Sequence, residues 1–174
     1  MPTTSGKPRA MTHALPRKSN FYIADDIRLE QGGKPSLLGF FPDNVVVVPI
    51  PEKTKSPTQK EPIAVFGLAF LANFPDATGS YSLGMEFLAP GDVILLKSTD
   101  GRVATEKDPG INVITRLQPF PIVAFGIHKL IVTLNKKQFR FSFEVRRGVA
   151  EPSHQQPGVL LTPEKHKQKA RQKK

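Results

Sequence analysis

The sequence contains neither cysteine nor tryptophan among its 174 residues. Without cysteine it can form no disulfide framework and no thiolate metal site, and it offers no thiol nucleophile. The longest apolar segment, Ile63 to Ala72, is far shorter than the roughly 20 residues that span a bilayer. The first 20 residues also lack the apolar stretch of a secretory signal peptide, so we expect a cytoplasmic protein.

Motifs for catalysis and for ligand binding are missing as well. There is no His-Glu-x-x-His metal motif, no EF-hand loop, no Gly-x-Ser-x-Gly nucleophile motif and no phosphate-binding loop. Three of the four histidines, His13, His154 and His166, lie near the chain ends, and only His128 lies among the expected strands. We interpret His128 as structural or exposed. The sequence therefore predicts a protein that is not an enzyme and has no cofactor, metal or catalytic residue.

Positive charge is plentiful and is concentrated near the two ends. The net charge is +10. Residues 1–19 and residues 151–174 each carry a net charge of +4, whereas the residues between them are nearly balanced. Both end segments lack hydrophobic periodicity. We predict a disordered basic tail over residues 1–19, a folded domain over 20–149 and a flexible basic tail over 150–174.

The C-terminal tail suggests one kind of partner. Its basic side chains could neutralise phosphates and so bind nucleic acid, or another acidic surface, without sequence specificity. The alternative is a tail that only keeps the protein soluble. The candidate nucleic-acid-binding residues are Lys165, Lys167, Lys169, Arg171, Lys173 and Lys174.

Alternating apolar and polar residues indicate β-strands. The clearest case is residues 139–146, where four apolar side chains alternate with four polar ones. We expect Phe141 and Phe143 to be buried there, with Arg140, Ser142 and Glu144 facing solvent. Further strands are expected at residues 21–27, 36–41, 45–48, 63–70, 81–87, 93–97, 103–105, 111–117, 122–127 and 130–134.

Four segments of the sequence give more specific expectations for strands and turns. Val45 to Val48 is apolar on both parities, which favours a strand covered on both faces. Residues 51–62 hold three prolines and no large apolar side chain, so they predict an exposed loop. Asp100-Gly101 predicts a hairpin turn between the strands on either side of it. Ile63 to Phe70 could be a buried strand or a short helix, and Gly67 favours the strand.

About eight or nine short strands, punctuated by proline and glycine and without a convincing helix, predict an all-β fold. We expect an immunoglobulin-like or related antiparallel β-sandwich. Two neighbouring acids stand out in its first strand. By parity Asp25 shares the apolar face with Ile23, so it should be less exposed than Asp26 and should accept a hydrogen bond from a turn amide or from Arg28 or Arg116. The functional alternative is a carboxylate that contacts a ligand or Ca²⁺.

The opening of the domain also carries a resemblance. Residues 24–30 (Ala-Asp-Asp-Ile-Arg-Leu-Glu), Gly32-Gly33-Lys34 and residues 37–40 (Leu-Leu-Gly-Phe) resemble the start of the bacterial domain-of-unknown-function family 6941. Phe120-Pro121, Gly126 and the closing Phe-x-Phe-x-Val resemble its end, so the resemblance covers about residues 20–147. It implies a compact sandwich without an established activity.

The leading hypothesis is a non-enzymatic binding or scaffold module whose partner is another protein or a second copy of the chain. The first alternative is a nucleic-acid-associated accessory protein that acts through its basic tails. An enzyme of unknown class is the second alternative. A pocket with converging polar groups would favour the enzyme, and salt-dependent binding to DNA or RNA would favour the accessory protein.

Overall fold

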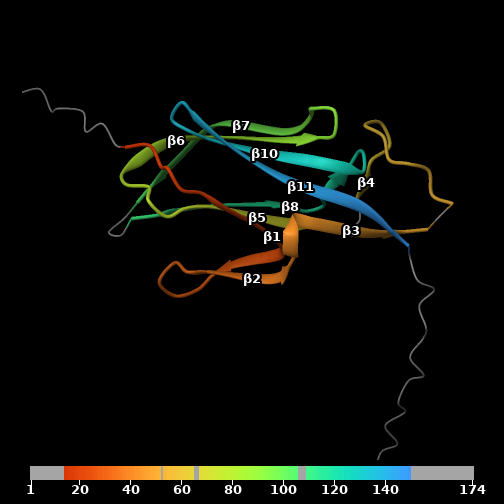
Figure 1. Cartoon of the computed structure of the whole chain (residues 1–174), viewed down its shortest axis with the longest axis horizontal. Helices are drawn as coiled ribbons and strands as arrows, with labels where there is room; N and C mark the ends of the chain where they lie inside the picture. Colours follow the sequence, from red (N-terminus) through yellow and green to blue (C-terminus); the bar gives the residue numbers. More distant parts are fainter. Residues whose placement is uncertain (1–13, 52, 65–66, 106–108, 150–174) are drawn as a thin grey trace, which may run out of the picture.

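The chain folds into two β-sheets that face each other, as seen in a computed structural model of the protein (Figure 1). The structure describes residues 14–51, 53–64, 67–105 and 109–149. Within these ranges there are eleven strands and one short 3-10 helix. They are β1 (Asn20–Leu29), β2 (Pro35–Phe40), η1 (Pro42–Asn44), β3 (Val45–Ile50), β4 (Ile63–Ala64), β5 (Leu68–Phe74), β6 (Ser80–Ala89), β7 (Val93–Ala104), β8 (Ile111–Leu117), β9 (Pro121–Ile122), β10 (Gly126–Leu134) and β11 (Lys137–Val149).

The four-stranded sheet has the order β2-β1-β5-β8, and the five-stranded sheet has the order β3-β11-β10-β6-β7. The short strands β4 and β9 pair only with each other. Neighbouring strands run antiparallel, except that β3 runs parallel to β11. The last strand, β11, pairs with β10 on one side and with β3 on the other.

The hydrophobic core lies between the two sheets. Every second residue of β5 points into it, and Phe70 sits near its centre. The Phe70 ring lies 4.9 Å from the Phe87 ring and 5.3 Å from the Phe143 ring, measured between centroids. Burying each such aromatic side chain contributes about 1.5–3 kcal/mol. This arrangement confirms the predicted all-β sandwich.

The last strand, β11, largely follows its predicted alternation. Phe143 is only 2% exposed, whereas Arg140 and Ser142 face solvent. The expectation that Phe141 is buried was wrong: it is half-buried and stacks on Phe21, with 4.9 Å between ring centroids. Both rings lie at the margin of the core, where the start of β1 gives only partial cover. Glu144, expected in solvent, is half-buried and accepts a hydrogen bond from Arg146.

The valine run also differs from its prediction. Val46 and Val48 are buried, but Val47 is 53% exposed. The expectation of cover on both faces was wrong because only the face of β3 that carries Val46 and Val48 packs in the core between the sheets.

The predicted Asp100-Gly101 hairpin is wrong too. β7 runs without a turn from Val93 to Ala104 and pairs along its length with β6. The register shift between Leu83 and Met85 accommodates one extra residue on β7. Gly101 is needed there for close packing rather than for a turn, since a Cβ on it would lie 3.1 Å from the Leu83 carbonyl oxygen.

The ambiguous segment at residues 63–70 is strand at both ends. Its first two residues form β4, and Leu68 begins β5. The interpretation as strand rather than helix is therefore confirmed for the described residues. No helix in the part of the chain that the structure describes is long and apolar enough to cross a membrane.

Residues 14–19, which the sequence placed in the N-terminal tail, contact the sandwich. The Tyr81 hydroxyl donates a hydrogen bond to the Ala14 carbonyl at 2.8 Å. The Arg17 and Lys18 amides donate to the Asp76 carboxylate at 2.9 and 3.2 Å. The Arg17 amide is the main reason why the pKa of Asp76 is lowered. The other parts of the predicted tails, residues 1–13 and 150–174, lie outside the described residues.

Candidate functional site: the outer face of the four-stranded sheet

The four-stranded sheet has an outer face that points away from the core. On β5 this face carries Ala69, Leu71 and Asn73, since the residues between them belong to the core. The strand register therefore aligns rows of side chains across β1, β5 and β8. The first row is an asparagine ladder: Asn20 donates to Asn73 at 3.2 Å, and Asn73 donates to Asn112 at 2.8 Å.

Two aromatic side chains dominate the next rows. Tyr22 is 36% exposed and Phe40 is 51% exposed, and their tilted rings lie 6.3 Å apart. Leu38, two residues before Phe40 on β2, is also exposed. We call Tyr22 and Phe40 the aromatic pair. It adjoins a small apolar cluster made of the buried residues Ala24, Ile27, Ala69 and Leu71.

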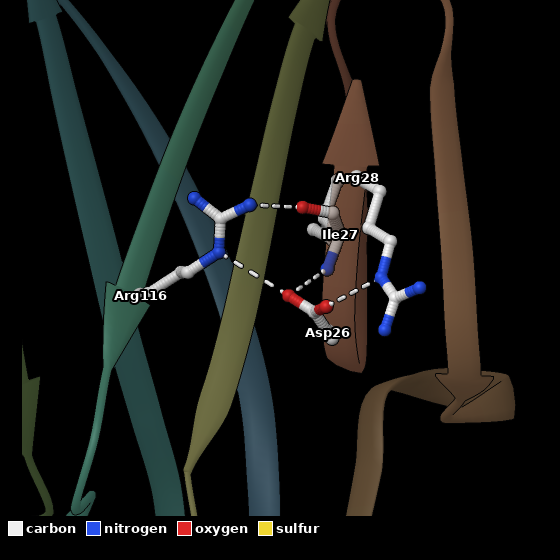
Figure 2. Close-up of polar contacts among 4 residues, drawn as sticks. All are labelled: Asp26, Ile27, Arg28 and Arg116. Carbon is white, nitrogen blue, oxygen red and sulfur yellow. Dashed lines mark hydrogen bonds and ion pairs between the residues drawn. The ribbon is translucent and has the colours of Figure 1, made fainter. Parts of the chain in front are cut away.

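Arg116 on β8 lies in the same register row as Phe40, with Ala24 and Ala69 between them, and its side chain is held by β1 (Figure 2). Its register partner on β5 is Ala69, whose small side chain lets the arginine extend across the sheet. Arg116 Nε donates to Asp26 Oδ1 at 3.2 Å, and its Nη2 donates to the Ile27 carbonyl. The Arg116 guanidinium thus binds both a side chain and a backbone carbonyl of β1, which is separated from β8 by β5.

Asp26 is the centre of this network. Besides Arg116, its carboxylate accepts hydrogen bonds from Arg28 Nε at 3.1 Å and from the Ile27 amide at 2.8 Å. The hydrogen bond from Arg28 and then that from Arg116 lower the pKa of Asp26, because both stabilise the ionised carboxylate. Asp26 is therefore ionised at neutral pH and holds both arginines in place.

The predicted roles of Asp25 and Asp26 are reversed in the structure. Asp25 is exposed, and Asp26 has the arginine and amide partners expected for Asp25. Ala24 and Ile27 belong to one cluster although they are three residues apart, so the alternation of β1 shifts by one residue between them. Opposite the shift, Gly39 adopts a φ of 64°, and the Asp25 side chain occupies the space that a Cβ on Gly39 would need. The chemistry was predicted correctly, but it was assigned to the neighbouring residue.

The outer face of the five-stranded sheet carries a different feature, a polar depression of about 210 Å³. An ion pair between Lys97 Nζ and Glu86 Oε1, 2.6 Å long, lies at one side of it. Asn135 lies at the other side, where its Oδ1 accepts a hydrogen bond from the Ser82 amide at 3.0 Å. The remaining lining residues are Leu83, Gly84, Met85, Ser98, Thr99, Thr133 and Gln138.

His128 is structural rather than exposed. It is fully buried between the sheets, and its ring stacks on Phe143 at 5.2 Å between centroids. Its Nδ1 donates to the Gly126 carbonyl at 3.1 Å, which leaves Nε2 as a buried acceptor without a partner. Burial lowers the pKa of His128, so the ring is neutral at pH 7.

The structure also bears on the other expected sites. Among the described residues, no three His, Cys, Asp or Glu side chains are close enough together to hold a metal ion. The six candidate nucleic-acid-binding residues, Lys165 to Lys174, lie outside the described residues. The aromatic pair was missed by the sequence reasoning, since Phe40 was read only as part of a returning strand. The sequence feature that could have indicated it is Tyr22, an aromatic residue next to the buried Ile23 and therefore on the outer face of the strand.

Comparisons with known proteins give little further information. No family model and no curated protein matches the chain. One similar solved structure is a beta-glucosidase from Listeria innocua in complex with gluconolactone, with 12% sequence identity and a TM-score of 0.33. The match covers 76% of this chain but only 17% of that one.

Proposed function

We propose that this chain is a non-enzymatic protein-binding module and that its partner docks on the outer face of the four-stranded sheet. The observation that carries the proposal is the exposed aromatic pair, Tyr22 and Phe40, on an open sheet face. Tyrosine, phenylalanine and arginine are enriched in the centres of protein interfaces, whereas lysine is depleted there.

The arrangement of Arg116 supports this role. Its guanidinium is held by the Asp26 carboxylate and the Ile27 carbonyl before any partner arrives. A side chain that is already ordered loses less conformational entropy on binding, and this favours affinity. The asparagine ladder gives the face a polar border with donors and acceptors, as interface rims have.

The test compares two surface variants of matched character. Tyr22→Ser combined with Phe40→Ser removes the aromatic pair, and Ile94→Ser removes a side chain that is 55% exposed on β7 of the other sheet. Both variants and the unmodified chain are used as bait in cell extracts, and light scattering measures their mass in solution. A protein partner or a self-association that is lost only with the aromatic pair supports the proposal. Equal behaviour of all three proteins contradicts it.

We also propose that the chain is a divergent member of domain-of-unknown-function family 6941. The supporting observation is that most of the residues carrying the resemblance lie in two hairpins, β1–β2 and β10–β11, while Phe120-Pro121 lie at β9, which precedes the second hairpin. Comparison of a member's experimental structure with this one tests it. A member with a different strand order would contradict the assignment.

Nucleic-acid association through the basic tails is a second candidate. A specific observation favours it: Lys53, Lys55 and Lys60 are exposed on the loop between β3 and β4, and Arg147 donates to the Thr54 carbonyl of that loop at 2.6 Å. Basic side chains therefore gather where β11 ends and the C-terminal tail begins.

A salt titration on random-sequence DNA and RNA tests this candidate. A tail that contacts four phosphates should lose about a hundred-fold in affinity between about 50 and 200 mM salt. Deleting residues 163–174 should remove most of that salt dependence without changing thermal stability. Equally weak binding by both proteins at low salt would leave the tail as a solubility feature.

A further inference from the structure

The polar depression on the five-stranded sheet exists because one row of side chains contains a glycine. The strand register places Gly84, Thr133 and Gln138 side by side across β6, β10 and β11. The neighbouring row carries Glu86, paired with Lys97, so two long side chains stand beside Gly84, which has no side chain. A Cβ on Gly84 would meet Thr133 Cβ and the Ser98 carbonyl oxygen at 3.5 Å, an ordinary contact distance. Neither packing nor a left-handed backbone therefore requires a glycine at position 84. The absence of a side chain there leaves the depression deeper.

The polar groups around this floor are partly oriented by their neighbours. Asn135 Oδ1 is occupied by the Ser82 amide, so its amide group presents donors to the depression. Gln138, which also lines the depression, accepts a hydrogen bond from Arg140 Nη2 at its Oε1 at 3.1 Å, so its amide nitrogen is the group that can donate to a ligand. The Glu86 carboxylate supplies acceptors.

The charge of the depression is balanced, since the Glu86 carboxylate is paired with the Lys97 ammonium. A small anion would be repelled by the first group, and a small cation by the second. A neutral molecule that both donates and accepts hydrogen bonds matches this lining best, because every polar group that it covers must find a partner. The volume of about 210 Å³ lies below the roughly 300–1,000 Å³ of pockets for drug-sized ligands. It suits a single ring with several hydroxyl groups.

We propose that this depression is a binding site for a neutral polyhydroxylated ligand of the size of one monosaccharide. Amide groups of Asn135 and Gln138 donate to ring and hydroxyl oxygens, and Glu86 accepts from hydroxyl groups. The site is independent of the protein-docking face, because the two lie on the outer faces of opposite sheets.

The experiment is a titration of the full-length protein followed by amide resonances in ¹⁵N-correlated NMR spectra. The probes are glucose, galactose, mannose and N-acetylglucosamine, with sodium acetate and methylammonium chloride as charged probes. For so small a ligand, a dissociation constant on the order of 1–10 mM is expected. Saturable shifts should be centred on Ser82, Gly84, Thr133 and Asn135 for at least one sugar, with smaller shifts for both charged probes.

Two variants and one control make the test specific. Gly84→Ala raises the floor without a clash, and Thr133→Val removes a hydroxyl while keeping the shape of the side chain. Each should weaken sugar binding by about tenfold. Ser142→Ala, on an exposed position of β11, should leave it unchanged. The unshifted core resonances of each variant report that it is folded.

The proposal is overturned by any of three results. The first is the absence of a saturable shift with every sugar up to about 100 mM, well above the expected dissociation constant. The second is stronger binding of acetate or methylammonium than of any sugar. The third is unchanged sugar affinity in Gly84→Ala, which would place the binding elsewhere.

Discussion

Arg116 on β8 and Asp26 on β1 form an ion pair of 3.2 Å across the intervening strand β5. The pair connects two strands that share no backbone hydrogen bonds, and it spans the strand between them (Figure 2). Its effect on stability depends on the ionised form of Asp26.

Asp26→Asn should make the protein less stable at pH 7 and less sensitive to acid. The pKa of Asp26 is lower in the folded chain than its ordinary value of 3.8. The stabilisation is therefore complete above about pH 4 and is lost as the pH falls through the lowered pKa. Urea denaturation at pH 7 and pH 3 measures both effects. Asp25→Asn is the matched control, and an equal loss in that variant would contradict the network described for Asp26.

Phe143→Ala and Phe141→Ala should have unequal effects on the last strand. Phe143 is almost fully buried, so its truncation should reduce the free energy of unfolding by about 3–5 kcal/mol. Phe141 is half-buried and should lose only about 1–2 kcal/mol. Chemical denaturation of the two variants gives both values. Equal losses would mean that the margin of the core is more tightly packed than the structure shows.

His128→Phe should remove part of the acid sensitivity. Burial lowers the pKa of His128 below its ordinary 6.5, so the unfolded chain binds a proton at a higher pH than the folded one. The stability that depends on neutral His128 is present above about pH 6.5 and falls as the pH drops below it. The phenylalanine variant should lose less stability between pH 7 and pH 5, and at pH 7 it should stay within about 1.5 kcal/mol of the parent. Parallel pH profiles for the two proteins would contradict this.

Asp76→Ala should release the segment at residues 14–19. The Asp76 carboxylate binds the amides of Arg17 and Lys18, the two residues after which trypsin would cut. Without it, cleavage there should speed up roughly tenfold, because proteolysis follows the population of the open segment. Mass spectrometry of timed digests locates the cuts. Asp92→Ala removes an exposed acid that does not contact this segment and should leave the rate unchanged. Faster cleavage in both variants would indicate general loosening.

The fold was predictable where one period governs a whole strand. In β11 the alternation of phenylalanines with polar residues gave the correct inner face, because the strand pairs regularly with β10. In β1 the same reasoning failed after Ala24, where the phase shifts by one residue. That shift depends on Gly39 of the partner strand and leaves no mark on the period of β1 itself.

The candidate sites were less predictable than the fold. Part of the fold was also hidden: Asp100-Gly101 has the composition of a turn, but β7 continues through it, with a register shift in its pairing with β6. The depression depends on which strands place Thr133 and Gln138 next to Gly84, and this pairing is a tertiary property. The sequence around a glycine in an alternating strand does not show whether the side chains on the neighbouring strands are long or short. Such sites arise from strand order, which the sequence reasoning did not supply.

The position of β11 has a consequence for how the protein is made. This strand lies between β3 and β10, although β3 ends at residue 50 and β11 begins at residue 137. During synthesis, the edges of β3 and β10 that pair with β11 therefore stay unpaired until almost the whole domain has left the ribosome. A nascent chain interrupted before residue 137 would display two strand edges open to pairing with other chains. Because β11 lies inside the sheet and is made last among these strands, its synthesis, rather than early collapse, is the step that completes the sandwich.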